Sequence, residues 1–477
     1  MIGRCADGLF RPASECEVAE LVRYASANDL KMRVRGSAHS HRPAILTGDF
    51  VRPPATDHNV NLALDRMTQV TFDDVRQQVT VEAGCTLRSL FSQLDARGWA
   101  LPTTAGITHQ TVGGFLSTGS SGGSLLHSIG RQVVALRLVD GRGTMHELRR
   151  DDDPDNPFFA AGVSLGLLGM ITAVTFQCVD RFCIIGSERT SSYAECEVDL
   201  FGDGATEKPS LEQIFRTREH ARVLWFPQPG VERVTVWQAR RMTANDGPFK
   251  PRPYLVFPRI GGSMRPAQVL LSLLLRMLDP INRPMSKTRS GRALQRVLQR
   301  LYPWLAGPFL RPGTQQFQDT WLDGLPMDNR VDSTVLPIEF TEMWLPLDRT
   351  REVMQELAAY YREGGFRRTG TFCSEIYCTP RSDFWLSPAF QQDVVKVNLF
   401  WFARNRADPA TDFFPGVWKR LQRYDYRMHW GKRLSTDVNY LRRQYPRWDD
   451  FFALRGRLDP QQLFLSDYWR DQLGVRA

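Results

Sequence analysis

Arg35-Gly36-Ser37-Ala38-His39-Ser40 is the stretch that decides the fold. It follows a strand-like run at 31–35, and its small residues let backbone amides approach a ligand closely. A second tract of small residues spans 111–123, and such a tract can lie flat against an extended cofactor. The two loops are therefore candidates for a pyrophosphate site. Neither a Walker A loop nor a G-x-G-x-x-G between strand and helix is present, so P-loop and Rossmann sites have no support.

The sequence around these loops predicts an N-terminal domain of short strands and helices. Ser14 is a helix cap, and apolar residues at helical spacing follow it. Alternating apolar residues predict antiparallel strands further on, and the domain is expected to close near Arg181. The helices are expected at 11–28 and 86–97, and the strands at 69–72, 78–82, 133–139, 146–148 and 173–177.

The rest of the chain predicts a second α+β domain over 182–424 and a C-terminal segment over 425–477. Strands are expected at 335–346 and 394–402, and a helix at 350–363. The last segment has a helix-and-turn pattern that we expect to pack back on the domain formed by 1–181. The predicted fold class is therefore α+β, with an antiparallel sheet in the second domain.

Charge is concentrated in one segment of the chain. The net charge is +9, but residues 251–312 hold eleven Lys or Arg and one acid, Asp279, so the remainder is close to neutral. This distribution argues against a generally basic nucleic-acid surface. Within the segment, 267–278 is too short to span a bilayer, and two interpretations stay open: a solvated cap helix or an anchor on anionic lipid.

The cysteines and the N-terminus bear on the cellular compartment. The eight cysteines never fall in C-x-x-C spacing, so we expect neither a disulfide scaffold nor a metal site. Residues 1–12 lack the apolar core of a signal peptide, and no run of about 20 apolar residues follows. The sequence predicts a cytoplasmic protein, with peripheral membrane contact through 251–312 as the alternative.

Four motifs, in order, resemble the PCMH-type FAD-binding domain of the vanillyl-alcohol-oxidase superfamily. The loop at 35–40 resembles the family's R-G-S-G-H-S, and Thr111-Val112-Gly113-Gly114 with Ser117-Thr118-Gly119 resembles its second FAD loop. Val139-Asp140-Gly141 and 164–169 resemble two further turns of that domain. The resemblance implies FAD as the cofactor. The residues it assigns to FAD are Arg35, Gly36, Ser37, Ala38, His39, Ser40, Thr111, Val112, Gly113, Gly114, Ser117, Thr118, Gly119, Ser121, Gly169 and Ile171.

The C-terminal motifs narrow the resemblance to aldonolactone and alditol oxidases. His429-Trp430-Gly431-Lys432 resembles their H-W-[GA]-K, Pro337-Ile338-Glu339-Phe340 their glutamate-bearing strand, and Ser374-Glu375-Ile376-Tyr377 the S-E-I-R strand of alditol oxidase. In about 186–325 we can place no motif of the family. The resemblance implies an FAD-dependent oxidoreductase that oxidises a hydroxyl of a sugar lactone, polyol or related alcohol, with oxygen or another acceptor taking the electrons.

The resemblance also implies roles for individual residues. His39 would lie beside the flavin 8α-methyl as the candidate for covalent attachment. Lys432 would lie near flavin N5, and Glu375 and His429 would hold the substrate hydroxyls or tune the lysine, with Glu339 as a further candidate. Tyr377 stands where alditol oxidase has Arg and cannot make bidentate contacts, which argues against a polyol substrate. Ser121 stands where the family has His, so the contacts on the pyrophosphate side are expected to differ.

Two other function classes are consistent with these residues. One is a membrane-associated dehydrogenase or reductase acting on a lipid-like substrate, because sterol side-chain reductases share the FAD domain. The other is a flavin-binding interaction module without turnover, which the presence of both Glu375 and Lys432 disfavours. A requirement for NADPH would identify the reductase.

Overall fold

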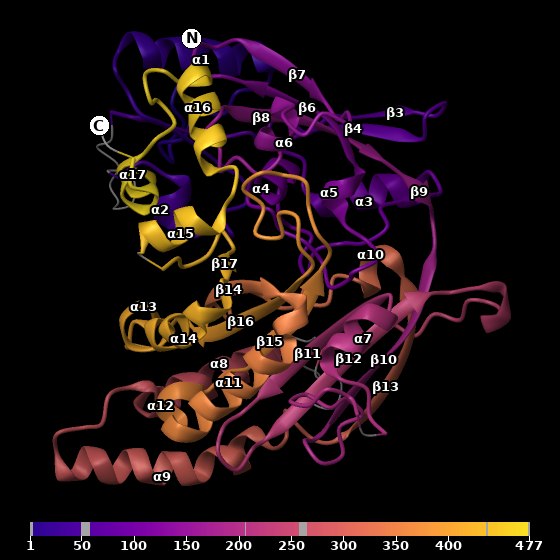
Figure 1. Cartoon of the computed structure of the whole chain (residues 1–477), viewed down its shortest axis with the longest axis vertical. Coiled ribbons are helices and arrows are strands. Elements are labelled where there is room, and N and C mark those ends of the chain that lie inside the picture. Colours follow the sequence, from indigo (N-terminus) through magenta and orange to yellow (C-terminus); the bar gives the residue numbers. More distant parts are fainter. Residues whose placement is uncertain (1–2, 49–57, 206, 257–264, 436, 476–477) are drawn as a thin grey trace.

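A computed structural model describes residues 3–48, 58–205, 207–256, 265–435 and 437–475. The N-terminal half of the chain contains a five-stranded antiparallel sheet, at the top of Figure 1, in the order β3-β4-β8-β6-β7, and a short antiparallel pair of β5 with β9. A separate parallel pair, β1 with β2, carries the loop at 36–40 at its end. The strands are β1 Met32–Arg35, β2 Val60–Ala63, β3 Val70–Asp73, β4 Gln78–Glu82, β5 Trp99–Ala100, β6 Val133–Val139, β7 Met145–Arg149, β8 Met170–Gln177 and β9 Val179–Asp180.

The helices of this half begin where their capping residues predict. The Ser14 side chain accepts a hydrogen bond from the amide of Glu17 at the start of α1, and Thr86 caps α3 in the same way. The buried faces of both helices pack in the core that the sheet shares, which is what their 3.6-residue apolar period predicts. The helices are α1 Glu15–Ala27, α2 Arg42–Ile45, α3 Leu87–Ala96, α4 Val112–Ser117, α5 Ile129–Gln132 and α6 Pro157–Ala161.

The second tract of small residues differs from the expected flat loop. Its first part forms helix α4, capped by the Thr111 side chain, which accepts from the amide of Gly114. A Cβ at Gly113 would lie 2.9 Å from the Cβ of Ala83, so the glycine permits the helix to pack against the end of β4. Tertiary packing therefore outweighs the low helix propensity of two glycines.

An eight-stranded sheet forms the lower half of Figure 1, in the order β13-β10-β12-β11-β15-β16-β14-β17. Every neighbouring pair is antiparallel, as the sequence predicts for this part. Its strands are β10 Cys183–Ser192, β11 His220–Phe226, β12 Arg233–Arg241, β13 Gly313–Thr320, β14 Ile338–Pro346, β15 Ser374–Thr379, β16 Val394–Phe402 and β17 Arg427–Met428. The helices between them are α7 Leu211–Thr217, α8 Arg265–Met277, α9 Arg289–Ala306, α10 Trp321–Gly324, α11 Thr350–Gly364, α12 Phe366–Thr369, α13 Pro409–Asp412 and α14 Phe414–Leu421.

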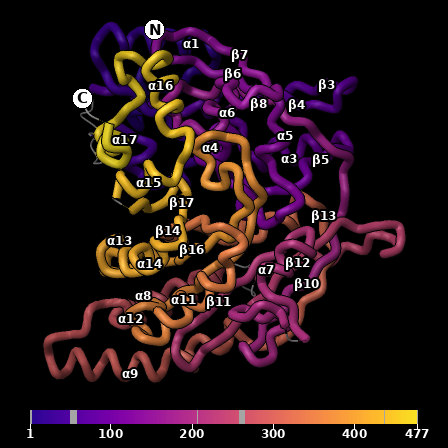
Figure 2. The backbone as a smooth tube through the Cα atoms, in the orientation of Figure 1, coloured from indigo at the N-terminus to yellow at the C-terminus, as the bar shows by residue number. Residues whose placement is uncertain are grey.

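The C-terminal segment returns to the N-terminal half, where Figure 2 shows it beside the start of the chain. It contains α15 Val438–Gln444, α16 Trp448–Leu458 and α17 Asp467–Leu473. The amide of Met32 donates to the carbonyl of Leu463 at 2.8 Å, and the Trp469 indole donates to the carbonyl of Ala44 at 2.8 Å. The C-terminal segment therefore packs against β1 and α2. The domain limits 1–181, 182–424 and 425–477 stay predictions.

The basic segment 251–312 forms α8 and α9, and 257–264 lie outside the described residues. In the described parts of the chain, no helix combines the length and apolar character needed to cross a membrane. All eight cysteines are free thiols in the structure.

Candidate active site

Two adjoining cavities lie between the loop at 36–40 and the large sheet. The first, which we call the sheet cavity, has a volume of about 320 Å³, and the second, the loop cavity, about 280 Å³. Both volumes are typical of parts of small-molecule sites. His39, Gln110, Ser120, His429 and Lys432 line both cavities. A ligand that filled the loop cavity would therefore meet a ligand in the sheet cavity at these five side chains.

The loop cavity has the features of an anion site. Ala38 has φ of +62°, a left-handed conformation that is rare for a residue with a Cβ and is common at functional loops. Among the described residues, the amides of 37–40 have no acceptor within the chain. Consecutive free amides in such a turn form a concave site for a phosphate. The loop thus fits the pyrophosphate of FAD.

Most of the residues predicted to bind FAD line the loop cavity. A Cβ at Gly36 would lie 2.1 Å from the Thr111 hydroxyl, so the two motif loops touch through this glycine. Val112 and Gly169 are buried away from the cavity, and Gly119 and Ser121 also lie outside its lining. The predicted residues in the lining are Arg35, Gly36, Ser37, Ala38, His39, Ser40, Thr111, Gly113, Gly114, Ser117, Thr118 and Ile171.

The loop cavity also contains residues that sequence reasoning missed. They come from the end of β2, from the turn after β4 and from α17, which are far apart in the sequence. A Cβ at Gly84 would meet the carbonyl of Leu64 at 1.7 Å, so this glycine was a usable signal for a close backbone contact. The missed residues include Leu64, Asp65, Ala83, Gly84, Thr86 and Trp469, and the 164–169 motif adds Leu165 and Gly166 to the lining.

His39 lies at the junction of the two cavities with its ring 4.8 Å from that of His109. Burial lowers the pKa of His39 to about 4, and the charges of His109 and Lys432 act in the same direction. The imidazole is therefore neutral near pH 7, with a lone pair available on one ring nitrogen.

Strand β14 carries a glutamate into the sheet cavity, but it is Glu342 and not Glu339. Ile338, Phe340 and Glu342 line the cavity, because alternate residues of a strand face the same side. Glu339 faces away and pairs with Arg433 at 2.8 Å. The Glu342 carboxylate is buried and accepts from the Trp344 indole at 2.8 Å. The strand that the family motif pointed to is thus in the site, with its cavity glutamate three residues further on.

Glu375 stands in a buried polar cluster at the wall of the sheet cavity. It accepts from Arg222 at 3.2 Å and from the Asn398 amide at 2.8 Å, and Arg222 also binds Asp328 at 2.8 Å. Burial and the charge of Asp328 raise the pKa of Glu375 to about 7, although Arg222 and Asn398 oppose the shift. A carboxyl with this pKa exchanges a proton readily at neutral pH.

The Asn398 side-chain carbonyl is buried and has no partner among the described residues. Asn398 lines the sheet cavity beside Glu375, so this acceptor is free to receive a hydrogen bond from a ligand hydroxyl. No sequence pattern singled out Arg222, Asp328 or Asn398.

The predicted pair His429 and Lys432 lies where the cavities meet. The amide of Gly431 donates to Nδ1 of His429, so the proton of the neutral ring is on Nε2, which donates to the Ser120 hydroxyl at 3.1 Å. Burial lowers the pKa of His429 to about 4. Nζ of Lys432 lies 4.0 Å from the ring centre of Phe340. Burial lowers the pKa of Lys432, and Glu342 and Glu375 counteract this effect.

Tyr377 and Ser121, the two departures from the family pattern, are linked by Lys396. Nζ of Lys396 donates to the Ser121 hydroxyl at 2.9 Å and lies 3.7 Å from the ring centre of Tyr377. The Tyr377 hydroxyl donates to Glu342 at 3.3 Å. Ser121 therefore lies on the sheet-cavity side, where it positions a second buried cation.

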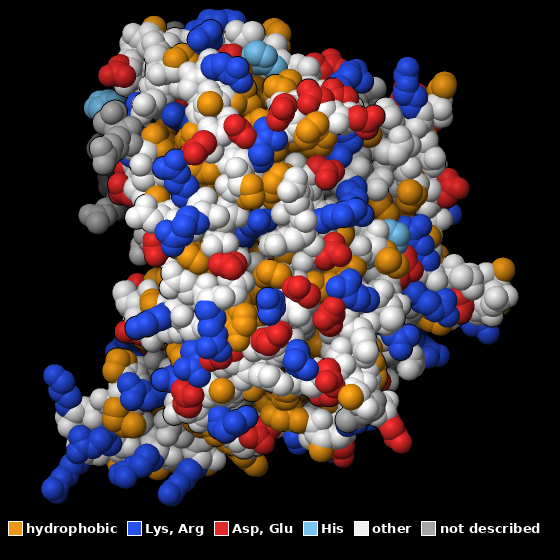
Figure 3. All heavy atoms as spheres, viewed as in Figure 1, with side chains coloured by type: hydrophobic (Ala, Val, Ile, Leu, Met, Phe, Trp, Pro, Cys, Tyr) orange, Lys and Arg blue, Asp and Glu red, His pale blue; other side chains and the backbone are white. Residues whose placement is uncertain are grey.

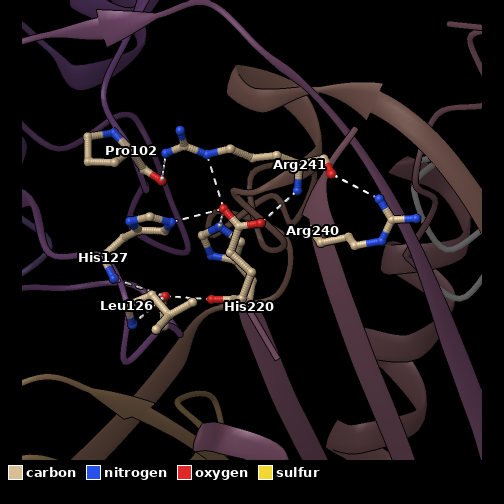
Figure 4. A network of polar contacts seen from close by, with 8 residues as sticks. Pro102, Leu126, His127, His220, Arg240 and Arg241 are labelled. Atoms are coloured by element: carbon tan, nitrogen blue, oxygen red, sulfur yellow. Dashed lines mark hydrogen bonds and ion pairs between the residues drawn. The ribbon is translucent and has the colours of Figure 1, made fainter. Parts of the chain in front are cut away.

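Another polar cluster joins the N-terminal half to the large sheet (Figure 4). His127 bonds to the Glu219 carboxylate at 2.9 Å, and the amide of Arg241 donates to the same carboxylate at 2.8 Å. His220 lies beside them, and the ligand atoms of the two histidines and Glu219 are within 4.8 Å of one another. The Arg241 side chain also lies 3.0 Å from Glu219, so the carboxylate is already neutralised. The cluster therefore connects the loop before α5 to β11 and β12 of the large sheet.

The fold and the site define an FAD-dependent oxidoreductase with a PCMH-type FAD-binding domain. The model of the FAD binding domain family matches residues 6–149, and that of the D-arabinono-1,4-lactone oxidase family matches residues 174–472. The second match covers more than half of the chain. The chain therefore belongs to the D-arabinono-1,4-lactone oxidase family.

Relatives match over the whole length. The chain is 28% identical to L-gulono-1,4-lactone dehydrogenase of Mycobacterium tuberculosis, over 98% of this chain and 97% of that protein. It is 27% identical to L-gulonolactone oxidase of Mus musculus, over 96% and 93%. The fold is similar to that of cholesterol oxidase from B. sterolicum, with a TM-score of 0.69 at 15% identity over 98% of this chain and 93% of that chain. These relatives give no support to a membrane-associated reductase of lipid-like substrates, since the likeness to cholesterol oxidase is one of fold alone.

Proposed function

We propose that this protein oxidises a ring hydroxyl of an aldono-1,4-lactone, and that the sheet cavity binds the lactone. The observation that carries the proposal is the polar cluster of Glu375, Arg222 and Asn398 in the same cavity as Lys432. Such a cluster offers both donors and a free acceptor to a small molecule with several hydroxyls. The printed names of the two full-length relatives, a lactone dehydrogenase and a lactone oxidase, support the same substrate class.

Bound FAD supplies the hydride acceptor, N5 of its ring. The residues of the chain would then perform three tasks. Glu375, with its pKa near 7, takes the proton of the hydroxyl that is oxidised. Lys432, at the junction of the cavities, supplies positive charge where negative charge develops. Neutral His429 donates a hydrogen bond from Nε2 to the Ser120 hydroxyl, which fixes the relative positions of these two side chains at the junction.

Tyr377 favours a lactone over an open-chain polyol. Its phenol presents a flat, partly apolar surface to the cavity and is held there by Glu342 and Lys396. A ring packs against such a surface, whereas a flexible chain loses more conformational freedom on binding. We therefore expect kcat/KM to depend more on whether the substrate is a ring than on how many hydroxyls it has.

A substrate panel tests this proposal. The FAD-loaded enzyme would be assayed with an artificial electron acceptor against L-gulono-1,4-lactone, D-arabinono-1,4-lactone, the corresponding alditols and a sterol. We expect kcat/KM to be highest for a lactone and at least about tenfold lower for the alditol of the same carbon skeleton. Preference for an alditol or a sterol would reject the lactone assignment while leaving the flavin assignment intact.

We further propose that the flavin is attached covalently through His39. The ring lies in the loop motif, lines both cavities and is neutral, as a nucleophilic nitrogen must be. The expected result is that yellow colour stays with the acid-precipitated protein and washes out of a His39→Ala variant. His109→Ala is the matched control, because it removes the neighbouring imidazole and is expected to retain the bound colour. Colour that washes out of the parent protein would mean that the FAD is dissociable.

Strand β14 provides a matched pair of glutamates that tests which face acts in the reaction. The Glu342 carboxylate faces the cavity, and its charge raises the pKa of Lys432. Glu342→Ala removes this charge, so we expect kcat to fall at least about tenfold. Glu339→Ala removes a half-exposed partner of Arg433, so we expect kcat to change less than about twofold. Steady-state assays at equal flavin content check both. Equal losses in the two variants would contradict the assignment of the cavity face.

A further inference from the structure

We propose that the exposed side of α9 docks on an anionic lipid surface. The observation is a row of exposed large hydrophobic side chains on this helix, beside exposed cations that form no ion pair with described residues. We call this row the α9 patch, and its apolar members are Leu294, Val297, Leu301 and Trp304.

The apolar side chains of the patch are arranged in one helical row. On α9, Leu294, Val297, Leu301 and Trp304 follow one another at spacings of three or four residues, so they share one side of the helix. Trp304 is 76% exposed. A packed helix normally buries such a row.

The buried side of α9 contains Gln295, Leu298, Tyr302 and Ala306. The exposed row of the same helix is therefore as apolar as the side that packs on the protein. A contiguous exposed apolar row of this kind indicates an interaction site.

The charges beside the row identify the chemistry of the partner. Lys287, Arg289, Arg296 and Arg300 are exposed and form no ion pair with described residues. The acid of this region, Asp279, is buried and bonds to Arg283. Figure 3 shows Lys and Arg side chains gathered at the lower left, over α9, with few acidic ones among them. The patch therefore attracts a negatively charged partner.

A lipid surface fits this combination better than two other partners. A second copy of the chain would bring the same unpaired arginines against one another, which is repulsive. A nucleic acid would use the cations but would leave the apolar row in water. On a membrane, the apolar row enters the headgroup region, and the arginines beside it reach anionic lipid.

The position of the patch leaves the two cavities free for their own ligands. The buried sides of α9 and of the turn after α8 pack on a core of their own, with Leu298, Tyr302, Leu278 and Ile281. None of the apolar members of the patch lines either cavity. Figures 1 and 2 place α9 at the end of the molecule opposite the N-terminal half. Docking therefore affects the location of the enzyme and not its choice of substrate. The inference does not depend on the proposed function.

Sedimentation with vesicles tests the proposal on the full-length, FAD-loaded protein. We expect binding to phosphatidylcholine vesicles that contain phosphatidylglycerol, weaker binding to pure phosphatidylcholine, and release as salt rises. Arg296→Gln with Arg300→Gln should lower the partition coefficient roughly tenfold or more. Leu301→Ser with Trp304→Ser should lower it to a similar extent.

Controls separate lipid binding from misfolding and from other partners. Met145→Ser, which changes an exposed hydrophobic side chain of the N-terminal sheet, should leave vesicle binding unchanged. Both patch variants should keep the flavin content and turnover of the parent. Absence of vesicle binding in the parent would overturn the proposal, as would a dimer in light scattering that the Leu301/Trp304 variant dissolves. Tighter binding to RNA than to anionic vesicles would also overturn it.

Discussion

Replacing Lys432 by Met lowers the rate of flavin reduction by the substrate about 10²–10³-fold in our account. The side chain lies at the junction of the two cavities, and among the described Lys and Arg residues it alone lines both. Met keeps most of the length of the side chain and its contact with the Phe340 ring. A lower rate of flavin reduction would therefore be due to the removal of the positive charge. Rapid mixing without oxygen measures the rate directly.

The control for this variant must separate chemistry from cofactor loss. Flavin content is measured first, because Lys432 also lines the loop cavity. Lys419→Met removes an exposed lysine of α14 and should leave the rate unchanged. A Lys432→Met enzyme that carries full flavin and is reduced at the parent rate would remove Lys432 from the mechanism.

The second large effect is expected at Glu375. Glu375→Gln keeps the hydrogen bond from Arg222 but cannot accept the proton, so we expect kcat/KM to fall about 10²–10⁴-fold. Because the pKa of Glu375 is raised to about 7, the parent should gain activity as the pH rises through that value and ionises the carboxyl. The variant should lose this limb of the pH profile.

Glu232→Gln serves as the matched control, since Glu232 is exposed and lies outside both cavities. It should keep both the rate and the limb near pH 7. A limb that persists unchanged in the Glu375 variant would assign the ionisation to another group.

The parts of the site that the sequence predicts are those that local backbone geometry requires. Loop 35–40 needs small residues because it lines the loop cavity with amides that have no acceptor among the described residues, and because Gly36 touches Thr111. The motif with His429 and Lys432 was recognisable for a similar reason, since Gly431 approaches Ser40 so closely that a Cβ would lie 2.9 Å from its hydroxyl. Such contacts restrict residue type and leave a pattern in the sequence.

The parts that could not be predicted depend on long-range pairing. Arg222 reaches Glu375 because β11 pairs with β15, and the sequence of neither strand alone determines the register of that pair. The motif ends at Phe340 and therefore indicates Glu339, whereas strand alternation places Glu342 and not Glu339 in the cavity. Helix α4 was missed because its two glycines argue against a helix until Ala83 is seen beside one of them.

The central claim is that this protein uses a bound flavin to oxidise a lactone in the sheet cavity. Its most direct test is to mix the FAD-loaded protein with L-gulono-1,4-lactone or D-arabinono-1,4-lactone without oxygen and to follow the flavin absorbance. We predict that the yellow band bleaches in the parent and in Lys419→Met, and that it bleaches far more slowly in Lys432→Met and Glu375→Gln. A band that no lactone bleaches, or that bleaches equally fast in all four proteins, would contradict the account.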